Sequence, residues 1–123
     1  MENRMLRINS KIKKKLSEII LYELRDPRFS DIISITWVRT SPNFSSCKIG
    51  VGILNNETDK RNEIIKLLNK SAGFMKKRLA EELKMRSVPK LIFTLDDSLI
   101  YAERINDILK NLDIKPEDNE KNE

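Results

Sequence analysis

The stretch DKRNEIIKLLNKSAGFMKKRLAEELKM, residues 59–85, decides how the rest of the chain is read. Apolar side chains recur along it every three or four positions, which is typical of one buried face on a long helix. They are Ile64, Leu68, Met75, Leu79 and Leu83. Gly73 interrupts this helix in the middle, although glycine costs on the order of 1 kcal/mol against alanine at a helical position. A packing notch, a bend and the close approach of a ligand to the backbone are three explanations for it.

Gly73 falls among lysines and not among the apolar residues. In an uninterrupted helix, Lys66, Lys70, Gly73, Lys77 and Lys84 would follow one line, because three- and four-residue steps return to the same face. A glycine in a cationic row lets a phosphate or sugar approach the backbone without a Cβ in the way. A break in the helix would add exposed amides and the positive end of a helix dipole, although a sharp bend would divide the line. We interpret the row as a nucleic-acid surface, with a solvated face as the alternative.

A second set of cations lies on the first predicted helix, residues 6–24. These cations share one stripe beside the apolar face, and no acidic residue lies between positions 3 and 17. They are Arg4, Arg7, Lys11, Lys14 and Lys15. Like charges three or four residues apart repel each other when nothing neutralises them. The single sign therefore favours an anionic partner, with a solvated face again as the alternative.

Two strands follow this helix. Asp26, Pro27 and Arg28 end the helix, because proline cannot continue the hydrogen-bond ladder. Residues 32–39 are rich in β-branched side chains and residues 46–53 alternate between apolar and small or polar, so the short turn between them predicts an antiparallel hairpin. Gly50 and Gly52 share one face of the second strand. We expect a packed helix against them. A nucleic-acid base is the other candidate, but proteins that bind bases on a sheet stack them on exposed aromatic residues, and the sequence shows no such row here.

The remaining residues predict a third strand and a last helix. Residues 91–95 form the strand, and Asp96, Asp97 and Ser98 supply capping oxygens for a helix over residues 99–112. Four apolar residues of this helix are expected to pack inward: Leu99, Ile105, Ile108 and Leu112. The acidic stretch at residues 113–123 has no periodicity and predicts a disordered tail. Residues 1–112 are then a single α+β domain.

The charge distribution favours a polyanionic partner. Residues 1–95 hold 20 Lys and Arg against 10 Asp and Glu, whereas residues 96–123 hold 4 against 9. The positive electrostatic potential of residues 1–95 attracts nucleic acid or an anionic membrane surface. No window approaches the roughly 18 consecutive apolar residues of a spanning helix, and the N-terminus lacks the apolar run of a signal peptide. We expect a cytoplasmic protein that does not insert into membranes.

The sequence offers little for catalysis or metal binding. It has no histidine, which removes the commonest general base and metal ligand. Cys47 is the single cysteine, and its place in an alternating strand predicts a small buried hydrophobe, with a reactive thiol as the minor alternative. Asp96 and Asp97 are better explained as helix caps than as a catalytic pair. We expect a monomeric binding protein that is not an enzyme, has no cofactor or metal, and takes no small-molecule substrate.

Markers spread along the chain resemble those of the ribosome-binding factor A family, bacterial proteins of small-subunit assembly, over residues 4–112. The markers are Asp26, Pro27 and Arg28; Val38, Ser41 and Pro42; Asn69, Ala72, Gly73 and Phe74; and Arg86, Pro89, Leu91, Phe93, Asp97 and Ser98. The resemblance implies a KH-like fold of the second type, α-β-β-α(kink)α-β-α, with helices on one face of a three-stranded mixed sheet. It also implies binding to free or immature small (30S) ribosomal subunits and their 16S rRNA, near the 5′-terminal helix, during late assembly and rRNA processing. No catalysis is implied.

The resemblance also bears on the interruption in the long helix. KH domains clamp nucleotides with a Gly-x-x-Gly loop, and this chain carries Ser71, Ala72 and Gly73 there. One glycine without a loop predicts a tight helix-kink-helix that reads folded rRNA by shape and phosphate. The candidate RNA-binding residues are Arg4, Arg7, Lys11, Lys14, Lys15, Lys66, Lys70, Ser71, Ala72, Gly73, Lys76, Lys77, Arg78, Lys84 and Arg86. The alternative is a generic KH-like RNA-binding domain, or a basic protein-interaction module, without a ribosomal role.

Overall fold

The structure is a computed structural model that describes residues 2–24 and 32–113. Two predicted segments lie outside these residues, as does the side chain of Leu99, which was predicted to pack inward. One is the turn at Asp26, Pro27 and Arg28, and the other is the acidic tail beyond Asp113. Asp113 itself closes the last helix.

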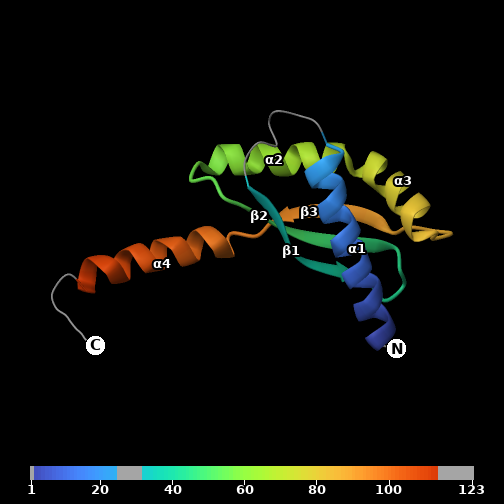
Figure 1. The fold of residues 1–123 in the computed structure, drawn as a ribbon, viewed down its shortest axis with the longest axis horizontal. Coiled ribbons are helices and arrows are strands. Elements are labelled where there is room, and N and C mark those ends of the chain that lie inside the picture. The colour runs from blue at the N-terminus through green and yellow to red at the C-terminus, as the bar shows by residue number, and fades with distance from the viewer. Residues whose placement is uncertain (1, 25–31, 114–123) are drawn as a thin grey trace.

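Helices and strands follow each other in the predicted order (Figure 1). The elements are α1 (Glu2–Tyr22), β1 (Ile33–Thr40), β2 (Ser46–Ile53), α2 (Thr58–Lys70), α3 (Ala72–Leu83), β3 (Lys90–Leu95) and α4 (Ser98–Asp113). The strands lie within one residue of their predicted bounds. The first helix begins earlier than predicted, because its polar first turn continues the helix beyond the apolar face from which its start was estimated.

The three strands form one mixed sheet in the order β1-β2-β3. β1 and β2 are antiparallel and form the predicted hairpin, whereas β2 and β3 run parallel. The register of the hairpin shifts between Ile35 and Trp37, so Thr36 forms a bulge. The Thr36 hydroxyl donates to Asp96 Oδ2 at 2.6 Å, which ties β1 to the residue that follows β3.

The core lies between one face of the sheet and the helices α1, α2 and α3. Figure 1 shows α1 crossing the sheet while α2 and α3 run along its upper side. Every second residue of β2 points into this core, as the alternating pattern predicts. The fully buried side chains include Ile12, Leu16, Ile19, Cys47, Ile49, Val51, Leu68, Met75, Leu79 and Phe93. The fold class inferred from the resemblance, an α+β domain with helices on one face of a mixed sheet, is confirmed.

The space beside Gly50 is filled by a side chain of the neighbouring strand. Gly50 pairs with Trp37 of β1, and a Cβ on Gly50 would overlap the indole ring of Trp37. The expectation of a helix against Gly50 was therefore wrong, because the indole lies flat over this position.

The last helix departs from its predicted packing. Figure 1 shows α4 projecting away from the sheet. Ile105, Ile108 and Leu112 are 39%, 56% and 57% exposed, so the prediction that they pack inward was wrong. Their spacing does form one apolar face, but in the described residues no element lies opposite it. Only the beginning of α4 is anchored, where Ile100 is buried and the helix contacts β2.

Candidate nucleic-acid interface

The interruption at residue 71 is a one-residue kink between α2 and α3. Ser71 has φ −88° and ψ 1°, and it lies between the last residue of α2 and the first residue of α3. Its amide donates to the carbonyl oxygens of Leu67 and Leu68 at 3.0 Å, and its own carbonyl accepts the Met75 amide at 3.1 Å. Ser71 thus hydrogen-bonds to residues of both helices, and no loop separates α2 from α3. The predicted tight helix-kink-helix is confirmed.

Gly73 lies in the first turn of α3, on its exposed side. Its φ is not positive, so the backbone conformation does not require glycine. A Cβ at this position would meet no heavy atom within 4 Å, so packing does not require glycine either. The packing-notch explanation is therefore excluded. What remains is an open stretch of backbone in the turn whose first amides have no partner within the helix.

A shallow groove of about 530 Å³ runs between this turn and the edge strand β3. Its walls are Asn69, Ala72, Gly73 and Lys76 from the helices, and Lys90, Leu91 and Ile92 from β3. The Asn69 side chain fixes the spacing of the two walls. Its amide nitrogen donates to Phe93 O at 3.0 Å and its oxygen accepts the Phe93 amide at 2.9 Å. These two bonds also cover part of an exposed strand edge.

Lys90 is a groove residue that sequence reasoning missed. It is the first residue of β3, so no helical periodicity connects it with the row of lysines on residues 59–85. Only the parallel pairing of β2 with β3, and the packing of α2 on β3, bring Lys90 close to Gly73. A basic residue at the start of an edge strand was the one available signal.

The kink divides the predicted row of lysines. Lys66 and Lys70 lie on α2, where they share a surface hollow with the acidic residues Asp59 and Glu63. Lys76, Lys77 and Lys84 are exposed on or just after α3, as is Arg86 beyond it. Lys84 ends α3 in the left-handed conformation, with φ 52°. Acidic residues therefore accompany the α2 half of the row, and its purely cationic part is the α3 half.

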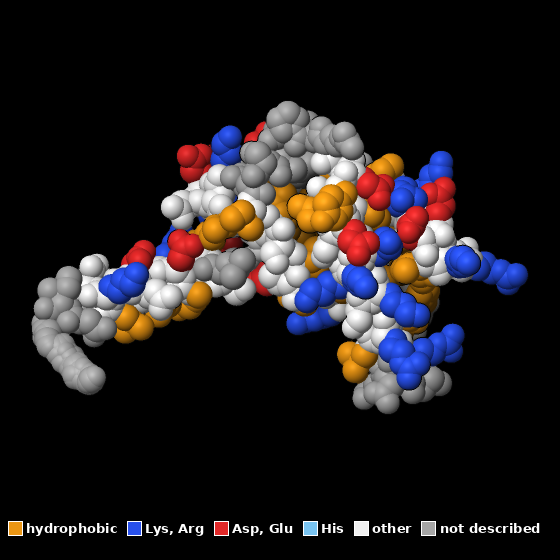
Figure 2. Space-filling view, viewed as in Figure 1, with side chains coloured by type: hydrophobic (Ala, Val, Ile, Leu, Met, Phe, Trp, Pro, Cys, Tyr) orange, Lys and Arg blue, Asp and Glu red, His pale blue; other side chains and the backbone are white. Residues whose placement is uncertain are grey.

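The α1 cations lie beside α3. Arg4, Arg7, Lys11 and Lys14 are exposed, and Figure 2 shows Lys and Arg side chains gathered over α1 and the adjoining α3. Lys11 and Lys14 line a surface depression with Glu82 and Leu83 of α3. The fold thus brings the first-helix stripe next to the second half of the long interrupted helix.

Lys15 and Arg78 occupy the contact between α1 and α3 and are engaged in ion pairs. Lys15 Nζ lies 3.0 Å from Glu18 and 3.1 Å from Glu82. The Arg78 guanidinium lies 2.7 Å from Glu23 and also contacts Glu81 and Glu82. Hydrogen bonds from Arg78 and Lys15 lower the pKa values of the Glu23 and Glu82 carboxyl groups. Both cations hold the helices together, and their charge is balanced locally.

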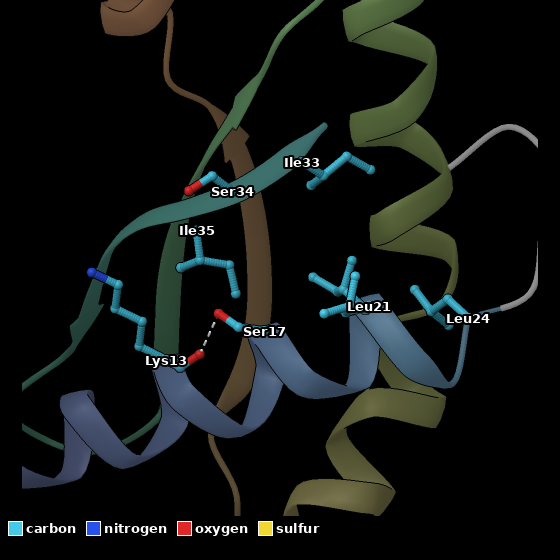
Figure 3. A pocket seen from close by; sticks show the side chains of 8 residues that line it. Lys13, Ser17, Leu21, Leu24, Ile33, Ser34 and Ile35 are labelled. Atoms are coloured by element: carbon cyan, nitrogen blue, oxygen red, sulfur yellow. Dashed lines mark hydrogen bonds between the residues drawn. The ribbon is translucent and has the colours of Figure 1, made fainter. Parts of the chain in front are cut away.

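Another cavity, of about 500 Å³, lies between α1 and the free edge of β1 (Figure 3). Lys13 stands at one end, while Leu21, Leu24 and Ile33 gather at the other. Its Ser17 hydroxyl already donates to the Lys13 carbonyl at 2.8 Å. None of the described residues that line the cavity carries a carboxylate or a thiol, and most of them are apolar.

The residues considered for catalysis have structural roles. Burial raises the pKa of the Cys47 thiol, as expected for a small hydrophobe in the core. Asp96 accepts the Ser98 amide at 2.9 Å, which confirms its capping role, and Asp97 lies 3.6 Å from the buried Arg61. In residues 2–24 and 32–113 there is no group of His, Cys, Asp or Glu that could hold a metal ion. Nor does the described part of the chain contain a helix that could span a membrane.

Comparisons with known proteins agree on one family. The family model described as ribosome-binding factor A matches residues 4–109. Ribosome-binding factor A of Caldanaerobacter subterraneus subsp. tengcongensis is 36% identical over 112 residues, which cover 91% of each chain. The crystal structure of the Thermus thermophilus protein superposes with a TM-score of 0.64 at 24% identity, over 74% of this chain and 93% of that one. A homology model of Thermus thermophilus ribosome-binding factor A, fitted into the cryo-EM map of a 30S complex, gives a TM-score of 0.60 at 25% identity, over 72% and 91%.

Proposed function

Because this chain belongs to the ribosome-binding factor A family, we propose that it is a maturation factor that binds free or immature small ribosomal subunits through their 16S rRNA. Contact near the 5′-terminal helix of that rRNA, during late assembly and rRNA processing, is the finer part of the proposal. The protein acts as a cytoplasmic monomer and by binding alone. The relative fitted into a 30S complex supports the choice of partner.

The observation that carries the proposal is the open backbone at Gly73 in a groove flanked by cations. Lys76 and Lys90 line the groove, and Lys70 precedes the kink. Phosphate contacts supply most of the affinity of such surfaces and position the protein on the nucleic acid. Without a Cβ at Gly73, an rRNA phosphate or sugar can approach the first amides of α3.

The remaining candidates take different parts in this interface. Lys77, Lys84 and Arg86 extend it along α3, and the exposed α1 cations form a second patch beside it. Ser71 and Ala72 shape the kink and one wall of the groove. Lys66 contributes less than Lys70, because both share a hollow with Asp59 and Glu63 but only Lys70 adjoins the kink. Lys15 and Arg78 act indirectly, by fixing α1 against α3.

Charge reversal in the groove tests the proposal. In Lys70→Glu/Lys76→Glu, the thermal midpoint should change little because both side chains are exposed. Co-sedimentation with free small subunits should fall, and the slope of log affinity against log salt should shrink by at least about 1.4, since each lost phosphate contact contributes about 0.7 to 0.9. Arg104→Glu/Lys110→Glu is the matched control, with the same charge change on exposed positions of α4.

Two results would contradict the proposal. One is equal subunit binding by the groove variant and the α4 control. The other is a complex in cell extract that survives nuclease treatment and does not co-sediment with free small subunits, which would favour a protein-interaction module.

A further inference from the structure

The sheet face that α1, α2 and α3 leave open carries exposed cations that form no ion pair with another described residue. Val38, Ile49 and Phe93 are buried toward the helices, so the residues that alternate with them point the other way. The residues on this open face include Trp37, Arg39, Lys48, Gly50, Lys90, Ile92 and Thr94. Arg39, Lys48 and Lys90 are exposed. They lie toward the hairpin turn, whereas α4 starts from the opposite end of β3.

Trp37 and Arg39 form a stack on Gly50. The indole of Trp37 lies directly over the Gly50 backbone, and the guanidinium carbon of Arg39 lies 4.5 Å from the centre of the indole ring. A cation over an indole face is held by the ring quadrupole. The guanidinium of Arg39 is thereby kept over a fixed aromatic surface, with its outer side exposed.

Within the described residues, no ion pair compensates the charges on this face. Arg39 lies directly opposite Lys48 in the antiparallel register, and like charges in that position repel each other. The ion pairs among the described residues involve Lys15, Arg61 and Arg78, and none of the three cations on the open face. An anionic ligand would remove this repulsion.

The open face is continuous with the groove at the kink. Lys90 and Ile92 belong to both, because β3 is the edge strand between them. Ile92 in turn pairs with Lys48 of β2, which lies opposite Arg39. A chain that leaves the groove beside Gly73 would therefore meet Lys90, Lys48 and Arg39 in that order.

We propose that this open face binds a single-stranded segment of RNA, with phosphates at Lys90 and Lys48 and one base stacked on the guanidinium of Arg39. Arg planes and aromatic rings are the surfaces on which proteins stack unpaired bases. An acidic peptide would match the charge but would make no use of a guanidinium held over an indole ring. The inference rests on the proposed function only in taking rRNA as the source of the segment.

Trp37 reports on this face selectively, because it is the single tryptophan of the chain. A ten-nucleotide RNA of mixed sequence, without self-complementarity, should change the Trp37 fluorescence saturably at low salt. Affinities are measured in parallel by the anisotropy of labelled RNA, so that altered fluorescence of a variant does not affect them. A titration that leaves Trp37 fluorescence unchanged would overturn the proposal.

Variants of Arg39 separate stacking from charge. Arg39→Ala should weaken binding of the RNA by about fivefold or more, the smallest loss expected when a base stack is removed. Arg39→Lys keeps the charge, so it should lose affinity while keeping the salt dependence. Lys48→Ala should lower the salt slope by about 0.7. Arg104→Ala, an exposed cation on α4, is the control and should bind as the unaltered protein does; equal affinity of Arg39→Ala would overturn the proposal.

Three further outcomes separate this inference from its rivals and from the proposed function. If Lys70→Glu/Lys76→Glu loses subunit binding while Arg39→Ala and Lys48→Ala keep both subunit and RNA binding, the open-face proposal falls and the proposed function stands. If Glu117→Gln/Asp118→Asn/Glu120→Gln in the full chain shifts Trp37 fluorescence without RNA and leaves RNA affinity unchanged, the acidic tail is the occupant and the proposal also falls. RNA binding that depends on Arg39 in a protein that fails to bind subunits would support the surface and contradict the proposed function.

Discussion

Glycine at position 73 lowers the stability of α3, although neither the backbone angles nor the packing of the described residues requires a glycine there. Its backbone angles are open to any residue and a side chain there would point into free space. The usual reasons for glycine, a left-handed turn or a close backbone contact within the protein, are both absent at this described position. A residue that reduces stability in this way belongs with functional positions, where proteins commonly give up stability.

Gly73→Ala should therefore raise stability and lower affinity together. The free energy of unfolding should rise by about 0.5–1 kcal/mol, the usual gain of alanine over glycine within a helix. Binding to small subunits should weaken, because the new methyl group keeps a phosphate or sugar away from the amides of α3. Urea unfolding and co-sedimentation measure the two effects. Asn62→Ala, on an exposed position of α2, should stabilise without weakening binding; a stabilised Gly73→Ala with full affinity would show that RNA does not approach this backbone.

Contacts between elements decide which cations are available to a ligand. Lys15 and Arg78 fit the helical patterns of their own segments as well as their neighbours do. Their partners Glu82 and Glu23 lie 67 and 55 residues away in the sequence. A helical wheel therefore cannot distinguish a cation that faces solvent from one that joins two helices.

Arg78→Ala should loosen the contact between α1 and α3 in a way that depends on pH. The pKa of Glu23 is lowered in the folded protein, chiefly by its hydrogen bond from Arg78, whereas the lowered pKa of Glu82 is due mainly to Lys15. The pair of Arg78 and Glu23 thus stabilises the fold above the ordinary glutamate pKa of about 4.3, and this contribution is lost as the pH falls through the lowered value. Arg78→Ala should lower the thermal midpoint at pH 7, and the difference from the unaltered protein should shrink as the pH falls below the ordinary glutamate pKa of about 4.3.

Lys77→Ala is the control for the Arg78 variant, because Lys77 is an exposed neighbour on α3 without an ion pair in the described residues. Its thermal midpoint should follow that of the unaltered protein at every pH. A difference between Arg78→Ala and the unaltered protein that stays constant with pH would assign the role of Arg78 to its aliphatic packing instead of its ion pairs.

A pattern within one segment does not show how distant segments pack, and this explains which parts of the fold could be predicted. The periodicity of apolar residues predicted the helices and strands. The family resemblance, which rests on markers spread along the chain, predicted the mixed sheet. The bulge at Thr36 and the place of Lys90 in the groove depend on register and on packing between distant segments. The stack of Arg39 on Trp37 also lay beyond the sequence, because it requires a glycine on the neighbouring strand at the matching position.

At the scale of the whole molecule, the protein consists of a packed body and a projecting helix. An apolar stripe on a helix predicts that one face avoids water, but it does not identify the surface that covers this face. On α4 the buried residue Ile100 lies near the start, while Tyr101, Ile105, Ile108 and Leu112 are exposed. The body therefore derives its stability from α1, α2, α3 and the sheet, with α4 attached through its first turns.

Two isoleucines on α4 test this division. Ile100→Ala should lower the free energy of unfolding by about 2–5 kcal/mol, because it empties a site that is 4% exposed. Ile108→Ala should change it by less than about 0.5 kcal/mol, since Ile108 is 56% exposed and lies on the uncovered face of the helix. Urea unfolding of both variants, each at a low and a high protein concentration, measures the difference. Equal losses of unfolding free energy would mean that α4 packs along its whole length in solution, either on its own body or on a second copy of the chain. If the effect of Ile108→Ala depends on protein concentration, the surface that covers α4 belongs to the second copy.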